Sequence, residues 1–325
     1  MKCQKTWAIV LAAGNGSRLA SLTTDESGHA VPKQFCSLRG GPSLLQEALK
    51  RALQVAPRGR LCVVVARQHE RYWRPALWSL PPRNVVIEPR NCGTANGVLL
   101  AVLHILERDP RARIVFLPAD HHVRDEQSLA KSVRASATWL TRNRDGLLLV
   151  GIEPDEVDPE LGYIVPGVPV GDGTCAVLRF VEKPPVADAR NLVARGALWN
   201  SFIFAAHAAT LLTLLRDRLP ESVAGMRTAL ARDRRRGQGA QALDEFYEHL
   251  CTEDFSRAIV QNAESVLRVL TAPACGWADL GTPRRVARVL QRLPTAGGSK
   301  PYASARPISA IVDLATQYER LSMAS

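Results

Sequence analysis

Short runs of β-branched apolar residues alternate with amphipathic segments through the first half of the chain. The runs predict buried strands at residues 7–12, 61–66, 85–88, 114–118 and 147–152, and the segments between them predict helices at 43–55, 94–108 and 127–142. A strand that returns to its sheet through a helix lies parallel to its predecessor in a right-handed unit. This order is typical of an α/β fold with a doubly wound, mostly parallel sheet and helices on both faces.

The second half of the chain is less regular. Strands are predicted at 162–165, 177–182, 201–205 and 266–271, and helices at 208–219, 222–250 and 284–293. The 325 residues contain no internal repeat, and we expect one α/β domain over residues 1–293. Residues 294–325 are expected to form a linker, at 295–307, and a short helical tail, at 308–321.

Composition excludes several classes of protein. Apolar residues make up 46% and charged residues 22% of the chain, which is typical of a globular domain and not of a disordered segment. No apolar run approaches the roughly 18 residues of a membrane span, so a membrane is not an expected partner. The chain enters its first strand without a signal-peptide cleavage site, and its seven cysteines contain no CxxC pair. We therefore expect a cytoplasmic protein in a reducing compartment.

The chain is basic, with 42 lysines and arginines against 31 acidic residues and a formal net charge of +11. One interpretation is a bias toward arginine across a solvated surface. The other is a polyanionic partner or a phosphate-bearing substrate. The densest basic run, residues 232–237, has no interleaved aromatic residue on which a base could stack, so nucleic acid is not an expected partner.

A glycine-containing turn follows the first predicted strand, at residues 11–19 (LAAGNGSRL). Two glycines allow a tight backbone that presents N–H groups to an anion, and Arg18 adds a positive charge. The dinucleotide-binding fingerprint is excluded because Leu19 stands where its third glycine would be, and a phosphate-binding Walker loop is excluded because no Gly-Lys-Ser/Thr follows. Taken alone, the segment is also compatible with a plain tight turn.

A second segment, residues 31–35 (VPKQF), places Lys33 beside a proline in a long loop that could fold back over the first turn. Together the two segments resemble the nucleotide-binding signature of the sugar-1-phosphate nucleotidyltransferases, and PKQF is similar to the mannose-1-phosphate guanylyltransferase branch. The resemblance continues in order to about residue 290. It runs through EPRNCGTA (88–95), LPADHH (117–122), GY (162–163), VEKP (181–184), WNS (199–201) and WADLG (277–281).

The resemblance implies a Rossmann-like nucleotidyltransferase fold and roles for individual residues. It implies nucleotide binding by Leu11, Ala13, Gly14, Gly16, Ser17, Arg18, Lys33, Glu88, Asn91 and Thr94. It implies that the sugar phosphate is held by Gly162, Glu182, Lys183 and Asn200, and that Mg²⁺ is held by Asp120 and Asp279. The implied catalytic residues are Arg18, Lys33, Lys183 and Asp120.

The position of Asp120 supports part of this assignment independently. It follows the predicted strand at 114–118, and open α/β sheets place their ligands beyond the carboxyl ends of the strands. One or two carboxylates suit Mg²⁺, which completes its shell with phosphate and water oxygens. The alternatives are a capping role for Asp120 and an ordinary turn at Asp279. His121 and His122 lack further ligands at metal-site spacing, so we expect them to pack and not to bind metal.

The reaction that the resemblance implies is an in-line displacement. An oxygen of a sugar-1-phosphate, mannose-1-phosphate in this branch, attacks the α-phosphorus of GTP, and pyrophosphate leaves as a GDP-sugar forms. Such a reaction needs positioning and charge neutralisation more than a covalent nucleophile. The sequence has no counterpart of the long isomerase domain of bifunctional relatives, so we expect one reaction only. A homodimer is left open, with residues 308–321 as a candidate interface.

Several positions depart from the family pattern. Ser17 stands for a threonine, and Phe202 follows WNS where the family carries a glycine. Ser256, Gln261 and Asn262 stand where the family commonly carries an aspartate and a Glu-Lys pair. These changes leave open another nucleoside triphosphate, another hexose- or heptose-1-phosphate, and a non-catalytic nucleotide-sugar sensor. An arginine-rich nucleic-acid binder is a further alternative and predicts steeply salt-dependent binding.

Overall fold

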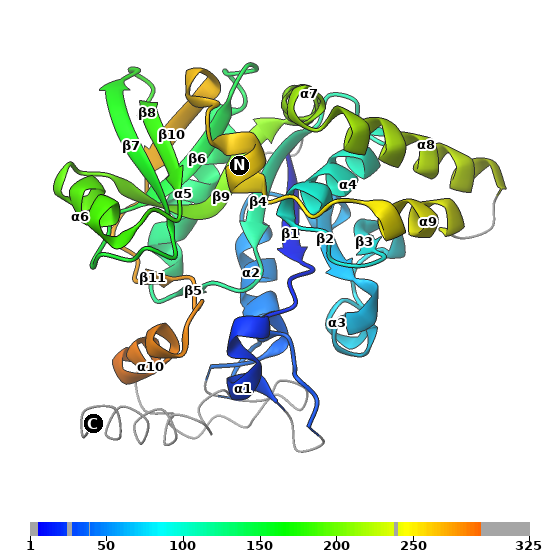
Figure 1. Cartoon of the computed structure of the whole chain (residues 1–325), viewed down its shortest axis with the longest axis horizontal. Helices are drawn as coiled ribbons and strands as arrows, with labels where there is room; N and C mark the ends of the chain where they lie inside the picture. The colour runs from blue at the N-terminus through cyan, green and yellow to red at the C-terminus, as the bar shows by residue number, and fades with distance from the viewer. Residues whose placement is uncertain (1–5, 25–27, 39, 237–239, 294–325) are drawn as a thin grey trace.

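The computed structural model describes residues 6–24, 28–38, 40–236 and 240–293. Its strands form one large mixed sheet and one small sheet (Figure 1). The large sheet consists of β1 (Thr6–Ala12), β2 (Leu61–Ala66), β3 (Val85–Glu88), β4 (Arg113–Pro118), β6 (Leu147–Ile152), β7 (Gly162–Pro169), β8 (Cys175–Glu182), β9 (Leu198–His207) and β10 (Leu267–Thr271). Across the sheet these strands lie in the order β3-β2-β1-β4-β9-β6-β10-β8-β7. The small sheet pairs β5 (His122–Val123) with β11 (Trp277–Ala278).

The doubly wound arrangement predicted for the first half is confirmed. Strands β3, β2, β1 and β4 lie parallel, and β2, β3 and β6 have the predicted bounds. Beyond β4 the sheet is mixed, because β9 runs antiparallel to both β4 and β6 while β10 lies parallel to β6. Strand β7 pairs antiparallel with β8 and β9. The expectation of a mostly parallel sheet therefore holds for the half of the sheet from β3 to β4. An apolar run in the sequence does not indicate the direction of its strand.

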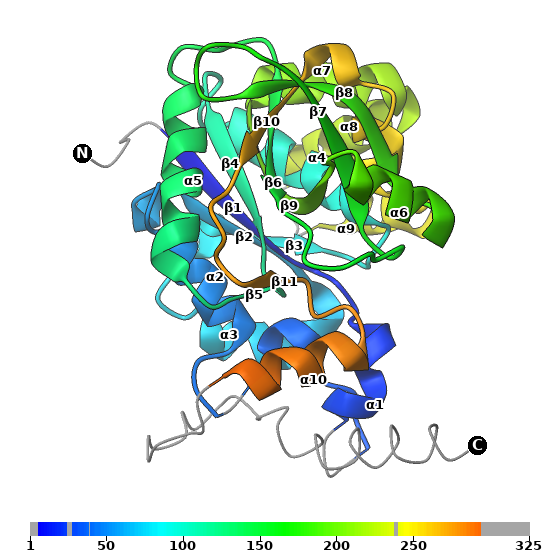
Figure 2. The same cartoon turned by 90° about the vertical axis from the view of Figure 1, so that its left-hand side faces the viewer.

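Helices cover both faces of the large sheet (Figure 2). On one face lie α2 (Leu44–Ala52) and α5 (Glu126–Trp139), and on the other lie α4 (Thr94–Leu106), α7 (Ala208–Arg218), α8 (Pro220–Arg236) and α9 (Gln241–His249). Alternate residues of β1 enter the two cores, with Ala8 and Val10 in the first and Trp7 and Ile9 in the second. The remaining α-helices of the described residues are α1 (Ala20–Thr23), α3 (Glu70–Ala76), α6 (Val186–Ala194) and α10 (Pro283–Arg292).

The helical stretch expected at 222–250 consists of two helices, α8 and α9. The carboxylate of Asp233, near the end of α8, accepts hydrogen bonds from the backbone N–H groups of Ala242 and Leu243 in the first turn of α9. This contact caps the second helix and sets it against the first. A sequence pattern does not show such a contact, because donor and acceptor meet only when the chain reverses.

Two further expectations concern the ends of the chain and membranes. The linker and tail expected at 294–325 lie outside the described residues, and the domain boundary at residue 293 stays a prediction. Among the described helices, none combines the length and the apolar character needed to cross a bilayer.

Candidate active site

A cavity of about 260 Å³ opens beyond the carboxyl ends of β1, β3 and β4. Its opposite wall comes from the start of β7, the end of β8 and the middle of β9. It is lined by most of the residues implied by the sequence motifs, namely Leu11, Ala13, Gly14, Arg18, Glu88, Asn91, Thr94, Asp120, Gly162, Glu182, Lys183, Asn200 and Asp279. Gly16 and Lys33 are not among its lining residues. The fold thus brings segments that are far apart in the sequence to one place, where open α/β sheets bind ligands.

The loop after β1 is held by the second motif, as the sequence predicted. Gly16 has a φ of +64°, and a Cβ at this position would lie 3.0 Å from the backbone nitrogen of Lys33. The side-chain amide of Gln34 donates to the carbonyl oxygens of Ala12 and Gly14, at 2.9 and 2.8 Å. A glycine is therefore required at residue 16, and its role is to let the two segments approach each other.

Lys33 lies behind the cavity wall and connects the two carboxylate residues implied for metal binding. Its Nζ is 3.0 Å from Oδ2 of Asp120 and donates to the backbone oxygens of Asp279 and Leu280, at 2.7 and 3.3 Å. The lysine is only 7% exposed. Burial by itself raises the pKa of Asp120, but the Lys33 ammonium, the charge of His121 and the hydrogen bonds to the carboxylate together outweigh this effect, and the pKa is lowered. In this structure Lys33 therefore keeps Asp120 ionised, and its three contacts are all to protein oxygens.

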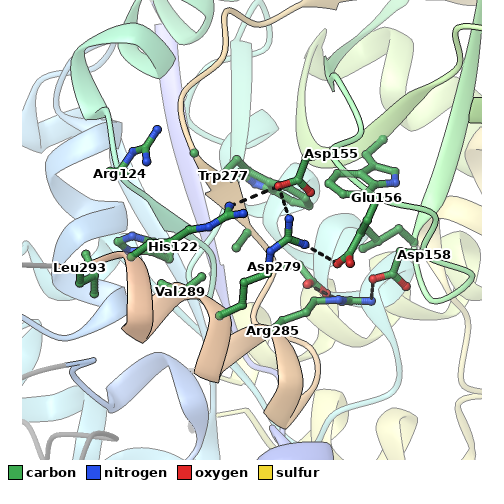
Figure 3. Close-up of a pocket in the computed structure, with 16 residues that line it drawn as sticks. His122, Arg124, Asp155, Glu156, Asp158, Trp277, Asp279, Arg285, Val289 and Leu293 are labelled. Atoms are coloured by element: carbon green, nitrogen blue, oxygen red, sulfur yellow. Dashed lines mark hydrogen bonds and ion pairs between the residues drawn. The ribbon is translucent and has the colours of Figure 1, made fainter.

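Asp279 is held from the opposite side by a residue that the sequence reasoning missed. Figure 3 shows Arg285, from the first turn of α10, between the carboxylates of Asp279 and Asp158, with an ion pair to each. All three side chains are close to nine-tenths buried. Thr282 caps this helix by accepting from the backbone N–H of Arg285 at 3.3 Å. A helix start at Thr282-Pro283 is visible in the sequence, but the partner Asp158 lies far away in the chain.

Asp120 and Asp279 are the two carboxylates that the resemblance implies for metal binding, and each is paired with a cation, Lys33 and Arg285 respectively. Asp120 and Asp279 line the same cavity, and both residues contact the same Nζ. Among the described residues there is no cluster of three or more histidine, cysteine or acidic side chains that could hold a metal ion by itself. Their oxygen atoms are the type of ligand that Mg²⁺ accepts, and this ion completes its shell with water and phosphate oxygens. His121 lines the cavity, and burial lowers its pKa to about 4.

Glu88, at the end of β3, is the buried acid on the side of the cavity implied for the nucleotide. It is 2% exposed, and its Oε1 accepts a hydrogen bond from the Tyr247 hydroxyl at 3.2 Å. Burial raises its pKa to about 8, against a lowering effect of the Tyr247 hydrogen bond. The partner Tyr247 comes from α9, so no local sequence signal links the two residues.

This raised pKa predicts a dependence of stability on pH. An ordinary glutamate loses its proton near pH 4.5, whereas folded Glu88 keeps it until about pH 8, so the native state binds the additional proton between these values. The free energy of unfolding should therefore fall as pH rises through this window, by up to about 1.4 kcal/mol per pH unit. Urea titrations between pH 5.5 and 7.5 should show a shallower fall for Glu88→Gln than for the unmodified chain. Equal slopes would contradict the assignment.

Asn91 and Thr94 use their side chains to build the cavity wall. Asn91 donates to the carbonyl oxygen of Ala13 at 3.1 Å and accepts from the N–H of Gly93 at 2.9 Å. The hydroxyl of Thr94, in the first turn of α4, accepts from the N–H of Phe255 at 2.8 Å. The nucleotide-binding role that the resemblance implies for these residues is thus accompanied by a structural one.

On the other wall, Glu182 lies at the end of β8 against the start of β7. A Cβ at Gly162 would lie 2.6 Å from Oε2 of Glu182, so a larger residue there would displace this carboxylate from its present position. Burial, with the charge of Asp254, raises the pKa of Glu182 to about 7. Lys183 follows with a left-handed φ of +48° and places its Nζ 3.8 Å from Oε1 of Glu182.

Of the three positions where the family commonly carries an aspartate and a Glu-Lys pair, two contact these residues directly. The side-chain amide of Asn200 donates to the hydroxyl of Ser256 at 3.3 Å, and Gln261 accepts from the backbone N–H of Glu182 at 3.2 Å. Asn262, the third, is the left-handed residue of a turn, where asparagine is tolerated. Ser256 and Gln261 therefore support, in place of charged groups, the side of the cavity that the resemblance implies for the sugar phosphate.

Carboxylates outnumber cations along the cavity. Among the described lining residues the acids are Glu88, Asp120, Glu160, Glu182, Asp254 and Asp279, and the lysines and arginines are Lys183 and Arg18. Arg18 itself pairs with Glu160 at 3.1 Å, and both side chains are about half exposed, so this ion pair is weak and exchangeable. A polyphosphate would therefore need further positive charge in order to bind here.

The arrangement was compared with known proteins. The model of the nucleotidyl transferase family matches residues 7–295, a range that contains every lining residue of the cavity. The chain belongs to this family. The resemblance that the sequence motifs indicated, including the mannose-1-phosphate guanylyltransferase branch, is confirmed by the relatives that the chain matches.

Three relatives of this nucleotidyl transferase are informative. The xanthan biosynthesis protein XanB of Xanthomonas campestris pv. campestris is 29% identical over 84% of this chain and 57% of its own length. The mannose-1-phosphate guanylyltransferase ManC of Salmonella typhimurium is 30% identical over 87% of this chain and 59% of its own length. A crystal structure from Thermus thermophilus, described as a mannose-1-phosphate geranyltransferase, has a TM-score of 0.76 at 32% identity, covering 90% of this chain and 81% of that one. The chain thus spans less than two thirds of the length of the two curated relatives, XanB and ManC.

Proposed function

We propose that the chain transfers a nucleotidyl group from GTP to mannose-1-phosphate, forming GDP-mannose and pyrophosphate. The observation that carries the proposal is the convergence of the implied nucleotide, sugar-phosphate and carboxylate residues on one cavity. An oxygen of the sugar phosphate attacks the α-phosphorus, and the bond from that phosphorus to the oxygen bridging to the β-phosphate breaks as pyrophosphate leaves. Family membership supports the reaction class, and the named relatives support the substrate pair.

The residues of this chain would act mainly by position and charge. Lys183 would hold the attacking sugar phosphate, and Arg18 would leave Glu160 to meet the triphosphate. Lys33 would keep Asp120 ionised and in place, as its contacts indicate. Mg²⁺ held by Asp120 and Asp279 would supply the positive charge that the acid-rich cavity lacks.

Glu88 supports guanine as the base. An ionised carboxylate offers two acceptor oxygens and no donor. Guanine carries neighbouring N–H donors at N1 and N2, whereas uracil presents one ring N–H between two carbonyl oxygens. Hydrogen bonds from such donors favour the ionised form, so the bound base would lower the raised pKa of Glu88. A carboxylate at the end of β3 is therefore a better partner for GTP than for UTP.

Pyrophosphate release tests the proposal. The purified chain with Mg²⁺ is assayed against four nucleoside triphosphates and a set of sugar-1-phosphates. We expect the highest kcat/KM for GTP with mannose-1-phosphate. A different best pair would keep the reaction and overturn the specificity. No release from any pair, with nucleotide sugars still binding by calorimetry, would favour the non-catalytic sensor, for which the uncharged Ser256 and Gln261 are the motivating observation.

A further inference from the structure

Phe202 has a backbone conformation that phenylalanine rarely adopts. Its φ is +58°, in the left-handed region, where a Cβ crowds the neighbouring carbonyl and glycine is favoured. The register between β6 and β9 shifts next to it, between Leu149 and Gly151, so that β9 bulges at this position. The hydroxyl of Ser201 anchors the bulge by donating to the backbone oxygen of Val150 at 2.6 Å. The strain is thus fixed by the surrounding sheet.

The bulge places a phenyl ring and an amide side by side in the cavity. The backbone N–H of Phe202 donates to Oδ1 of Asn200 at 3.1 Å, and both residues line the cavity together with Glu182. The ring of Phe202 meets those of Phe204 and Phe255 edge-on, with centroids 5.8 and 6.0 Å apart. The residue is partly buried and lines the cavity.

Core packing alone does not account for this residue. Phe204 already stacks on Phe116 and on Phe255, and all three are at most 1% exposed. Phe202 is only partly buried, so its ring adds less to the core than theirs while its backbone is strained. Strained residues of this kind are concentrated at ligand sites, where the side chain has to be aimed in one direction.

We propose that Phe202 is a specificity-determining residue, which packs its ring against the sugar of the sugar-1-phosphate. The proposal rests on the proposed function, because Glu182 and Asn200 mark the sugar side only if the chain binds a sugar phosphate. A phenyl face offers no hydrogen bond and contacts the C–H face of a sugar ring. The chemical class selected is therefore a hexose-1-phosphate without a bulky or additional hydroxyl-bearing substituent on the face toward the ring.

The test compares kcat/KM for a hexose-1-phosphate with that for a heptose-1-phosphate and an N-acetylhexosamine-1-phosphate, all with GTP. The unmodified chain should favour the hexose. Phe202→Gly should raise the ratio of bulky sugar to hexose by about tenfold or more, because it empties the space beside Asn200 and relieves the backbone. Phe202→Leu, which retains apolar volume, should keep the ratio within about threefold of the original.

A second variant guards against a folding effect. Phe202→Asn removes the ring while asparagine tolerates the left-handed conformation, so the same shift in ratio is expected. An equal change in kcat/KM for all sugars would indicate a merely structural role and overturn the proposal, as would an unmodified chain that prefers the bulkier sugars. If no pair releases pyrophosphate, the proposed function fails, and calorimetric affinities of the same proteins for GDP-hexose and GDP-heptose then decide the role of Phe202.

Discussion

Replacement of Asp120 by asparagine is expected to lower kcat/KM for nucleotidyl transfer by about a thousandfold. Asparagine keeps the size of the side chain but removes the negative charge at the end of β4, so the proposed magnesium ion loses a ligand. Groups that neutralise phosphate charge in a transition state typically contribute about 10²–10³ in rate each. Pyrophosphate release at saturating Mg²⁺ measures the effect.

The same substitution also affects Lys33, and this needs a control. With asparagine at residue 120 the buried ammonium loses the negative charge that it pairs with and keeps only neutral acceptors, so we expect a loss of about 1–2 kcal/mol in the free energy of unfolding. The double variant Lys33→Met, Asp120→Asn should recover stability but not activity. Asp217→Asn, at an exposed position on α7, should change neither. Activity within threefold of the original in Asp120→Asn would remove this residue from the mechanism.

Arg285→Met is expected to have the second largest effect, on stability and activity together. It leaves Asp158 and Asp279 as a pair of like charges, each close to nine-tenths buried and without their shared cation. Removal of one partner from a buried ion pair typically costs about 3–5 kcal/mol. Since Asp279 lines the cavity, we also expect activity to fall about a hundredfold and the Mg²⁺ concentration for half-maximal activity to change.

Two further variants distinguish the positioning of Asp279 by Arg285 from the effect of the positive charge alone. Arg285→Lys restores a cation but not the planar fork that reaches both carboxylates, so it should recover stability only in part. Arg284→Met changes the neighbouring, largely exposed arginine, whose contact to Glu156 is 3.7 Å, and should leave activity unchanged. If Arg285→Met unfolds like the unmodified chain and keeps its Mg²⁺ dependence, Arg285 does not position Asp279.

Buried strands and their ends could be predicted from the sequence because a short run of apolar residues by itself indicates a buried strand. The apolar run at 61–66 predicted β2 with its bounds, and the run at 114–118 placed Asp120 correctly beyond a parallel strand. Helix α2 was also predictable from nearby residues, because its capping box joins Ser43 and Gln46, which are three positions apart. The short helices α3 and α6 were missed, because they contain few buried residues and their apolar pattern is weak.

The direction of each strand and the contacts between distant residues could be learned only from the tertiary structure. The apolar run of β9 does not indicate that it lies antiparallel between β4 and β6. The contacts of Lys33 with Asp120, and of Arg285 with Asp158 and Asp279, join residues far apart in the chain. The folded chain brings such residues into contact by closing long loops. Their separation in the sequence does not show which of them will meet.

The amino-acid sequence by itself determined which residue types are available for chemistry: glycines in the first turn, cations at 18, 33 and 183, and carboxylates at 88, 120, 182 and 279. These follow from motifs whose members lie within a few residues of one another. The tertiary structure decided how each is used. It buried Lys33 against Asp120, raised the pKa of Glu88 through burial, and turned Phe202 into the cavity through a bulge. The charge state of a side chain and the direction in which it points depend on the groups around it. Those groups come together only in the folded chain.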